Sequence, residues 1–179
     1  NNPDRSWKGA PANNIITTWN SGTGWTYAYN SSPLTVADDP SQTLYSDTRV
    51  VKGTSTSSGG AGFAYADFAI PTTAGVTYVC SCWFKSSTRP GYIYMHDVTG
   101  NNVVTSSATI ADGTWQRVSK EFTSTTSGYV RIHMVTYNGT ASGEVVWATA
   151  PQIEQSPVVT PYVLGTRSNT QSLLDMTGQ

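Results

Sequence analysis

Three stretches of this chain alternate between apolar side chains and aromatic, basic or imidazole side chains. They are residues 78–85 (Tyr-Val-Cys-Ser-Cys-Trp-Phe-Lys), 92–96 (Tyr-Ile-Tyr-Met-His) and 129–137 (Tyr-Val-Arg-Ile-His-Met-Val-Thr-Tyr). Successive side chains of a β-strand point to opposite faces of a sheet, so a period of two predicts a strand. Each stretch therefore predicts a strand with one apolar face, turned to a core, and one face that carries functional groups.

Further strand candidates lie between turn signals along the rest of the chain. They are residues 25–29, 49–52, 63–70, 115–123 and 144–153. No segment shows a convincing helical period. About ten short strands, spaced roughly 8–12 residues apart, are typical of a sandwich or barrel. We therefore predict an all-β fold, a β-sandwich jelly roll of two antiparallel sheets.

The two ends of the chain differ from its middle. Residues 1–13 are mostly polar and include two prolines, which indicates an N-terminal arm. From Ser156 onward, Pro157, Pro161 and Gly165 are turn signals, and no period is sustained. The predicted organisation is an arm at 1–13, a carbohydrate-binding-like sandwich at 14–155 and a C-terminal linker or extension at 156–179.

Composition excludes two classes of partner. Charged residues are only 12% of the 179, and the formal net charge is -1. Binding to nucleic acid needs a basic excess, so nucleic acid is not an expected partner. No apolar run approaches the ~20 residues of a membrane span, so no membrane insertion is expected.

The two cysteines, Cys80 and Cys82, are two residues apart in one predicted strand. The rise of a strand places their Cα atoms roughly 6.5–7 Å apart, at or beyond the upper limit for a disulfide. A zinc site would need further thiol or imidazole ligands at finger spacing, and the sequence has none. We therefore expect two free thiols, buried in the core.

Seven residues fall opposite the apolar positions of the predicted strands and form the candidate ligand site. A sugar presents a C–H face that stacks on aromatic rings and hydroxyls that need donors and acceptors. The alternative is that these side chains only pair across strands and stabilise a solvent-facing sheet. The seven residues are Trp83, Lys85, Tyr92, Tyr94, His96, Arg131 and His133.

Metal binding and catalysis have weaker signals. His96 and His133 lack a third ligand at metal spacing and are expected to form hydrogen bonds instead. Asp38, Asp39 and Asp47 lie in loops, and a structural calcium there stays an open alternative, with no other cofactor expected. No motif of a nucleophile, phosphate loop or metalloprotease is present, and no carboxylate pair suits glycoside hydrolysis. The chain is not expected to be an enzyme.

Several segments resemble the jelly-roll carbohydrate-binding modules of families 4, 9 and 22. The segments are Gly24-Trp25, Gly75–Tyr78, Trp83–Lys85, Tyr94–Asp97 ahead of Gly100-Asn101, Gly113–Ser119 and Val145–Trp147. The resemblance spans roughly residues 14–155 and implies a carbohydrate ligand. Many of these modules hold a structural calcium with an acidic residue of the last strand, whereas residues 146–150 read Val-Trp-Ala-Thr-Ala.

The end of the chain resembles a second group of proteins. Ala150–Gln155, Thr160–Tyr162 and Gly165–Ser168 look like the close of similar domains in bacteriophage tail-fibre and other virion proteins. This resemblance implies a module of a larger virion protein, on the virion surface or in another extracellular location.

The two resemblances and the candidate site lead to one expected function and one rival. The expected function is a non-catalytic module that binds a polysaccharide or cell-surface glycan. The rival is a structural or assembly domain of a phage fibre or capsid decoration protein, without a sugar ligand of its own. Its partners would be other virion subunits.

Overall fold

The computed structural model describes residues 25–26, 34–46, 48–56, 63–68, 72–87, 91–97, 113–124, 130–136, 142–156 and 158–162. Side chains are described in these ranges except at 25–26, Leu34, 63–68, 91–97 and 130–136, where the backbone and its register are described. In this part of the chain, no helix is long and apolar enough to cross a bilayer.

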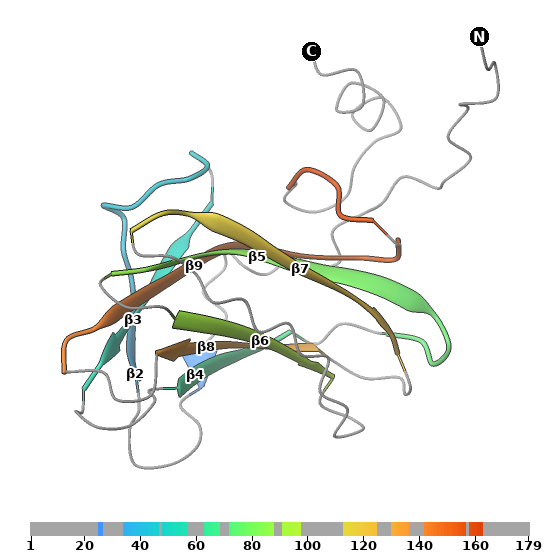
Figure 1. The fold of residues 1–179 in the computed structure, drawn as a ribbon, viewed down its shortest axis with the longest axis horizontal. Coiled ribbons are helices and arrows are strands. Elements are labelled where there is room, and N and C mark those ends of the chain that lie inside the picture. Colours follow the sequence, from blue (N-terminus) through green and yellow to red (C-terminus); the bar gives the residue numbers. More distant parts are fainter. Residues whose placement is uncertain are drawn as a thin grey trace, which may run out of the picture.

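The described residues form nine strands in two antiparallel sheets, stacked as two layers (Figure 1). The four-stranded sheet has the order β1-β4-β8-β6 and the five-stranded sheet the order β2-β3-β9-β5-β7. The prediction of an all-β jelly-roll sandwich is confirmed. The strands are β1 (Trp25–Thr26), β2 (Leu34–Asp38), β3 (Val50–Ser55), β4 (Phe63–Phe68), β5 (Thr77–Ser86), β6 (Gly91–Asp97), β7 (Gln116–Thr123), β8 (Val130–Thr136) and β9 (Val145–Glu154).

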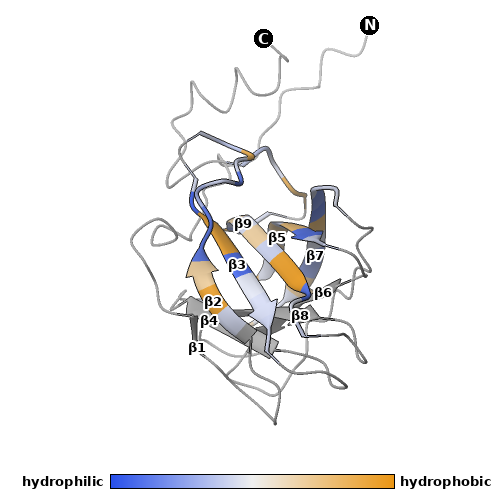
Figure 2. Ribbon diagram, turned by 90° about the vertical axis from the view of Figure 1, so that its left-hand side faces the viewer, coloured by the Kyte–Doolittle hydropathy of each residue, from blue (hydrophilic) through white to orange (hydrophobic). Residues whose placement is uncertain are grey.

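The inward face of the five-stranded sheet carries the alternation that the sequence predicts for residues 78–85. Tyr78, Cys80, Cys82 and Phe84 are at most 2% exposed. The Tyr78 ring stacks on Phe122 of the neighbouring strand β7, with ring centroids 5.7 Å apart. Val51 of β3 pairs with Ala148 of β9, and both are fully buried on the core side; hydrophobic stretches of β2, β3 and β9 are visible in Figure 2.

Strand β9 contains a bulge that reverses its outward set of side chains. Ala150 has a φ of 51°, and the pairing of β9 with β5 shifts there. Trp83 pairs with Thr149, whereas Ser81 pairs with Gln152, so β9 has one extra residue between these pairs. Odd-numbered residues therefore point outward before the bulge, and even-numbered residues point outward after it.

The bulge places two polar side chains, Gln152 and Glu154, on the outward face, where they are fully buried and bond to residues 160–161. The Thr160 amide donates to the Glu154 carboxylate at 3.1 Å, and the Thr160 hydroxyl donates to its other oxygen. The Gln152 amide nitrogen donates to the Thr160 carbonyl at 3.2 Å. The predicted linker thus begins with residues that lie against the sheet, while the domain boundary at residue 155 stays a prediction.

One edge of the five-stranded sheet is polar and the other is short. Strand β7 forms one edge, and its central residues Ser119, Lys120 and Glu121 are exposed. Strand β2 forms the other edge and is only 5 residues long.

Both cysteines are buried free thiols, on the same inward face. Cys82 Sγ donates to the Thr149 carbonyl at 3.3 Å. Burial raises the pKa of Cys82 to about 12 and raises the pKa of Cys80 well above its usual range. In both cases the neutral thiol is the form that the core accepts.

We expect these thiols to make the fold less stable in alkali. The folded-state pKa of each thiol lies above its unfolded value, so its contribution is complete below about pH 8.5 and is lost as the pH rises above that value. The free energy of unfolding should fall by up to about 1.4 kcal/mol per pH unit for each thiol. Urea unfolding of the native chain and of the Cys80→Ala/Cys82→Ala variant between pH 8 and 10 measures this, and parallel curves would contradict it.

The contacts of Thr160 lead to a second prediction, on the stability of the fold. Thr160→Val keeps the shape of the side chain but removes the hydroxyl that donates to the buried Glu154 carboxylate. The free energy of unfolding should fall by about 1–3 kcal/mol, the cost of an unsatisfied buried acceptor. Val158→Ala is the matched control in the same segment, because Val158 is 47% exposed. Equal stability of the two variants in urea would show that the Thr160 hydroxyl adds nothing to the fold.

Candidate functional site

The structure divides the seven predicted site residues between the two sheets. Trp83 and Lys85 lie in β5 of the five-stranded sheet. The other five lie in the four-stranded sheet, in β6 (Gly91–Asp97) and β8 (Val130–Thr136). The single site expected for all seven residues is therefore divided between two sheets. Alternation defines the two faces of a strand but not the sheet that it joins, and the outward faces of two packed sheets lie on opposite sides of a sandwich.

Within the four-stranded sheet, the register brings the five remaining positions together. Tyr94 pairs with His133, and His96 pairs with Arg131. On the other side of β8, His133 pairs with Tyr65 and Arg131 pairs with Asp67 of β4. Two adjacent rows result, Tyr65–His133–Tyr94 and Asp67–Arg131–His96.

A third row, Phe63–Val135–Tyr92, completes the set, which we call the nine-position face. It adds three aromatic or acidic residues that the sequence reasoning left out, Phe63, Tyr65 and Asp67. The alternation of residues 63–68, Phe-Ala-Tyr-Ala-Asp-Phe, can be read from the sequence, whereas their pairing with β8 cannot. The alternate positions of the same strands are apolar and suit the core side: Ala64, Ala66, Ile93, Met95, Ile132 and Met134.

On the five-stranded sheet, lysines and tryptophans alternate in one row that crosses three strands and ends at the residue before a fourth. Trp147 pairs with Lys52 of β3 on one side and with Lys85 of β5 on the other. Trp115 comes directly before Gln116, which pairs with Phe84, so it lies level with Lys85. The Lys85 ammonium lies 4.5 Å from the Trp147 ring centroid and 5.0 Å from that of Trp115, both within the range of a cation–π contact.

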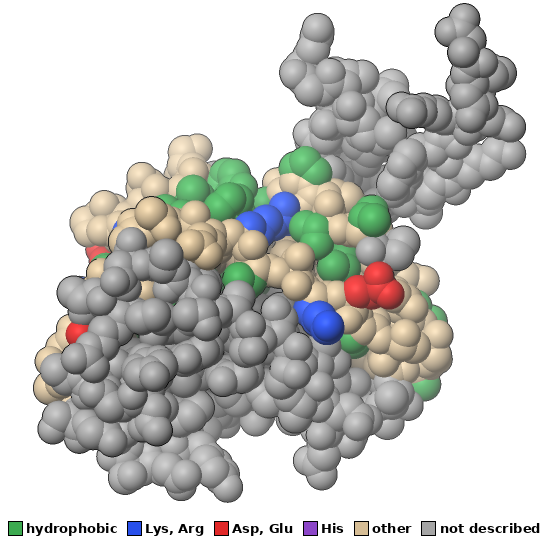
Figure 3. Space-filling view, viewed as in Figure 1, with side chains coloured by type: hydrophobic (Ala, Val, Ile, Leu, Met, Phe, Trp, Pro, Cys, Tyr) green, Lys and Arg blue, Asp and Glu red, His purple; other side chains and the backbone are tan. Residues whose placement is uncertain are grey.

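Two side chains of the loop between β2 and β3 bind this row. The Lys85 ammonium donates to the Gln42 side-chain carbonyl, and the Trp147 indole donates to Asp39 Oδ2 at 2.8 Å. Burial lowers the pKa of Lys85, and the Asp39 carboxylate opposes that shift. Hydrogen bonds from Ser41 and Trp147 lower the pKa of Asp39. Figure 3 shows basic side chains among hydrophobic ones on this layer.

Trp83 lies beneath an aromatic cluster. Tyr45 of the loop meets it edge-on, with centroids 6.5 Å apart and planes at 72°. Tyr162 of the C-terminal segment packs on Tyr45 at 5.3 Å. Figure 1 shows the loop and this segment on the side of the five-stranded sheet that faces away from the other sheet. These contacts show how the Trp83 and Lys85 side chains pack without a ligand. A role in ligand binding stays a prediction for both residues.

The loop between β2 and β3 borders an open hollow of about 380 Å³, lined by residues from Asp38 to Val50. Its two carboxylates already have protein partners. Arg49 Nε donates to Asp38 at 2.5 Å, and Asp39 accepts from Trp147 and Ser41. Within the described ranges, no three His, Cys, Asp or Glu residues gather as metal ligands. Asp47 and the side chains of His96 and His133 lie outside those ranges, so the calcium alternative stays a prediction.

Comparison with known proteins identifies the fold. No protein-family model and no curated protein matches the chain. Among solved structures, the CBM22-1 xylan-binding domain of Paenibacillus barcinonensis Xyn10C superposes with a TM-score of 0.54 at 14% identity, covering 82% of this chain and 97% of that one. The fold is shared with a carbohydrate-binding module.

A second similar structure is a viral protein. The enzymatically active domain of bacteriophage CBA120 tailspike protein 4 matches with a TM-score of 0.54 at 16% identity. The match covers 78% of this chain but only 21% of that one, so this fold corresponds to a part of the tailspike structure.

The aromatic cluster on β5 yields an energetic prediction. Because Tyr45 and Trp83 touch, their separate removal should not be additive. A double-mutant cycle of Tyr45→Ala and Trp83→Ala, followed by urea unfolding, should give a coupling energy of about 0.5–1.5 kcal/mol. The same cycle with Thr123→Ala in place of Tyr45→Ala is the control and should give about zero, because Thr123 is an exposed residue at the β7 edge. A coupling energy near zero in the first cycle would mean that the loop does not rest on Trp83.

Proposed function

We propose that this chain is a non-catalytic carbohydrate-binding module and that the nine-position face is its ligand site. The single observation that carries the proposal is the register of β4, β8 and β6, which aligns Tyr65, His133 and Tyr94 beside Asp67, Arg131 and His96. The ligand class is a polysaccharide or cell-surface glycan.

The dimensions and chemistry of this face suit an oligosaccharide. Neighbouring strands lie about 4.8 Å apart, and positions two residues apart on one strand are about 7 Å apart. Three strands and three rows therefore spread the aromatic and polar groups over roughly 10 by 14 Å. Tyrosine rings offer flat surfaces for the C–H faces of sugars, while Arg131, Asp67 and the two histidines supply donors and acceptors for hydroxyls.

The same face argues for binding without hydrolysis. Asp67 is the single carboxylate among the nine positions. Glycoside hydrolysis ordinarily uses two carboxyl groups about 5–9.5 Å apart across the scissile bond. A face with one acid suits recognition, and the similarity to a xylan-binding domain supports the same reading.

The setting of the module is the finer part of the proposal. We place it in a larger virion or surface protein, on the virion surface or in another extracellular location, supported by the similarity to part of a tailspike. That similarity also favours the second candidate function, a structural or assembly domain of a phage fibre or capsid decoration protein whose partners are virion subunits.

The test is a glycan array with the whole chain, followed by titration calorimetry of the best glycan. We expect a Kd in the micromolar to millimolar range, since a face on a sheet buries little of its ligand. Tyr94→Ala should weaken binding about tenfold or more, because a stacking surface is lost. Arg131→Ala should weaken binding by a similar factor.

Thr123→Ala is the control, because this exposed residue lies at the far edge of the other sheet. It should leave affinity unchanged. No glycan bound by the native chain would favour the assembly function. Full affinity in a folded Tyr94→Ala/Arg131→Ala variant would move the site away from this face.

A further inference from the structure

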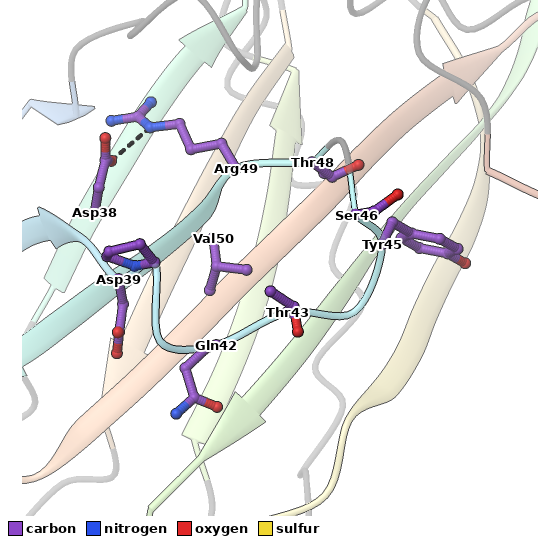
Figure 4. Close-up of a pocket in the computed structure, with 10 residues that line it drawn as sticks. Asp38, Asp39, Gln42, Thr43, Tyr45, Ser46, Thr48, Arg49 and Val50 are labelled. Carbon is purple, nitrogen blue, oxygen red and sulfur yellow. Dashed lines mark hydrogen bonds and ion pairs between the residues drawn. The ribbon is translucent and has the colours of Figure 1, made fainter.

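The loop between β2 and β3 is an arc over the start of β3 that leaves a hollow of about 380 Å³ (Figure 4). Small-molecule sites in proteins commonly measure about 300–1,000 Å³. The hollow is therefore large enough for one small ligand. It lies on the five-stranded sheet, in a different layer from the nine-position face.

The arc is held in shape from outside the hollow. The Asp39 and Gln42 side chains are fixed by Trp147 and Lys85 of the sheet. Tyr45 is packed against Trp83 and Tyr162.

Backbone hydrogen bonds fix both ends of the arc. The Asp39 amide donates to the Val50 carbonyl at 3.0 Å, and the Thr48 amide donates to the Tyr45 carbonyl at 3.3 Å. Because these contacts already orient the lining, a ligand would meet a preformed site and would have little ordering entropy to overcome.

The lining combines an apolar base with a polar rim. Val50 is 4% exposed and lies within the arc (Figure 4), and Pro40 is a second apolar residue of the lining. Thr43 and Ser46 are exposed and contribute hydroxyls to the rim. A ring with C–H groups on one side and hydroxyls around its edge matches such a lining.

The charged groups of the lining already have partners in the protein. Arg49 is paired with Asp38 at 2.5 Å, and the Asp39 carboxylate accepts hydrogen bonds from Trp147 and Ser41. An anionic ligand would meet two carboxylates, and a cation would have to displace bonds that these carboxylates already make. A neutral ligand carries neither cost.

We propose that this hollow binds one neutral pyranose unit, so that the chain has a second glycan site on the sheet opposite the nine-position face. The inference rests on the proposed function for the class of ligand, but it uses none of the residues of that face. A hollow with room for a single unit suits the end or a branch of a glycan, whereas the nine-position face suits an oligosaccharide segment.

The experiment uses the whole chain, labelled with ¹⁵N, and the methyl glycosides of glucose, galactose, mannose and N-acetylglucosamine as probes. At least one should shift the amides of residues 41–46 and the Trp147 indole N–H, since the acceptor of that N–H lines the hollow. Methyl glucuronide is the acidic comparison and should bind at least fivefold more weakly than the corresponding glucoside.

Two variants locate the response. Thr43→Val/Ser46→Ala removes both rim hydroxyls and should weaken the loop response about fivefold or more. Val158→Ala and Tyr94→Ala should leave the loop response unchanged. Thr43 and Ser46 are exposed, so the double variant should fold, and its unperturbed amide spectrum elsewhere checks this.

The experiment can disprove the second site without disproving the proposed function. Shifts in residues 91–97 and 130–136 with none in the loop overturn the second site and leave the proposed function standing. Shifts in the loop alone support the second site, and the glycan titration with the Tyr94→Ala/Arg131→Ala variant then decides on the nine-position face. No shift with any glycoside, an unchanged loop response in Thr43→Val/Ser46→Ala, or tighter binding of the glucuronide overturns the inference.

Discussion

A single extra residue in β9 determines what the outward side of the five-stranded sheet can hold. The bulge at Ala150 moves the outward positions from Trp147 and Thr149 to Gln152 and Glu154. The first half of the strand therefore presents an indole that binds the loop between β2 and β3. The second half presents an amide and a carboxylate that bind the backbone and hydroxyl of Thr160. Without the bulge, Ile153 would point outward in place of these polar groups.

The covered surface that results differs from an open aromatic platform. Trp83 and Lys85 look like exposed binding groups in the sequence, yet each has a partner from a segment distant in the chain. Packing of this kind converts a polar loop, which would otherwise be poorly ordered, into a defined wall of a cavity. The four-stranded sheet carries the candidate ligand site instead, because its register groups aromatic and polar positions of neighbouring strands.

The sequence predicts which side chains of a strand are buried better than it predicts which strands share a sheet. The alternation in residues 78–85 correctly separates Tyr78, Cys80, Cys82 and Phe84 from Trp83 and Lys85, because burial of one face forces a period of two. Sheet membership depends on long-range pairing, so nothing local shows that β5 and β6 belong to different sheets. The bulge and the Glu154–Thr160 contact were hidden for the same reason. The seven predicted residues therefore separate into a group of five, which share one face of the four-stranded sheet, and a group of two in the five-stranded sheet.

The edges of the five-stranded sheet affect how closely copies of this domain can be placed. An unpaired edge strand is a template for another chain, and solvated charges on it discourage such pairing. The exposed Ser-Lys-Glu run of β7 gives one edge this protection, while β2 is too short to offer a long template. Copies of this domain can therefore be crowded, as in an array of repeats, with little risk that their five-stranded sheets fuse edge to edge.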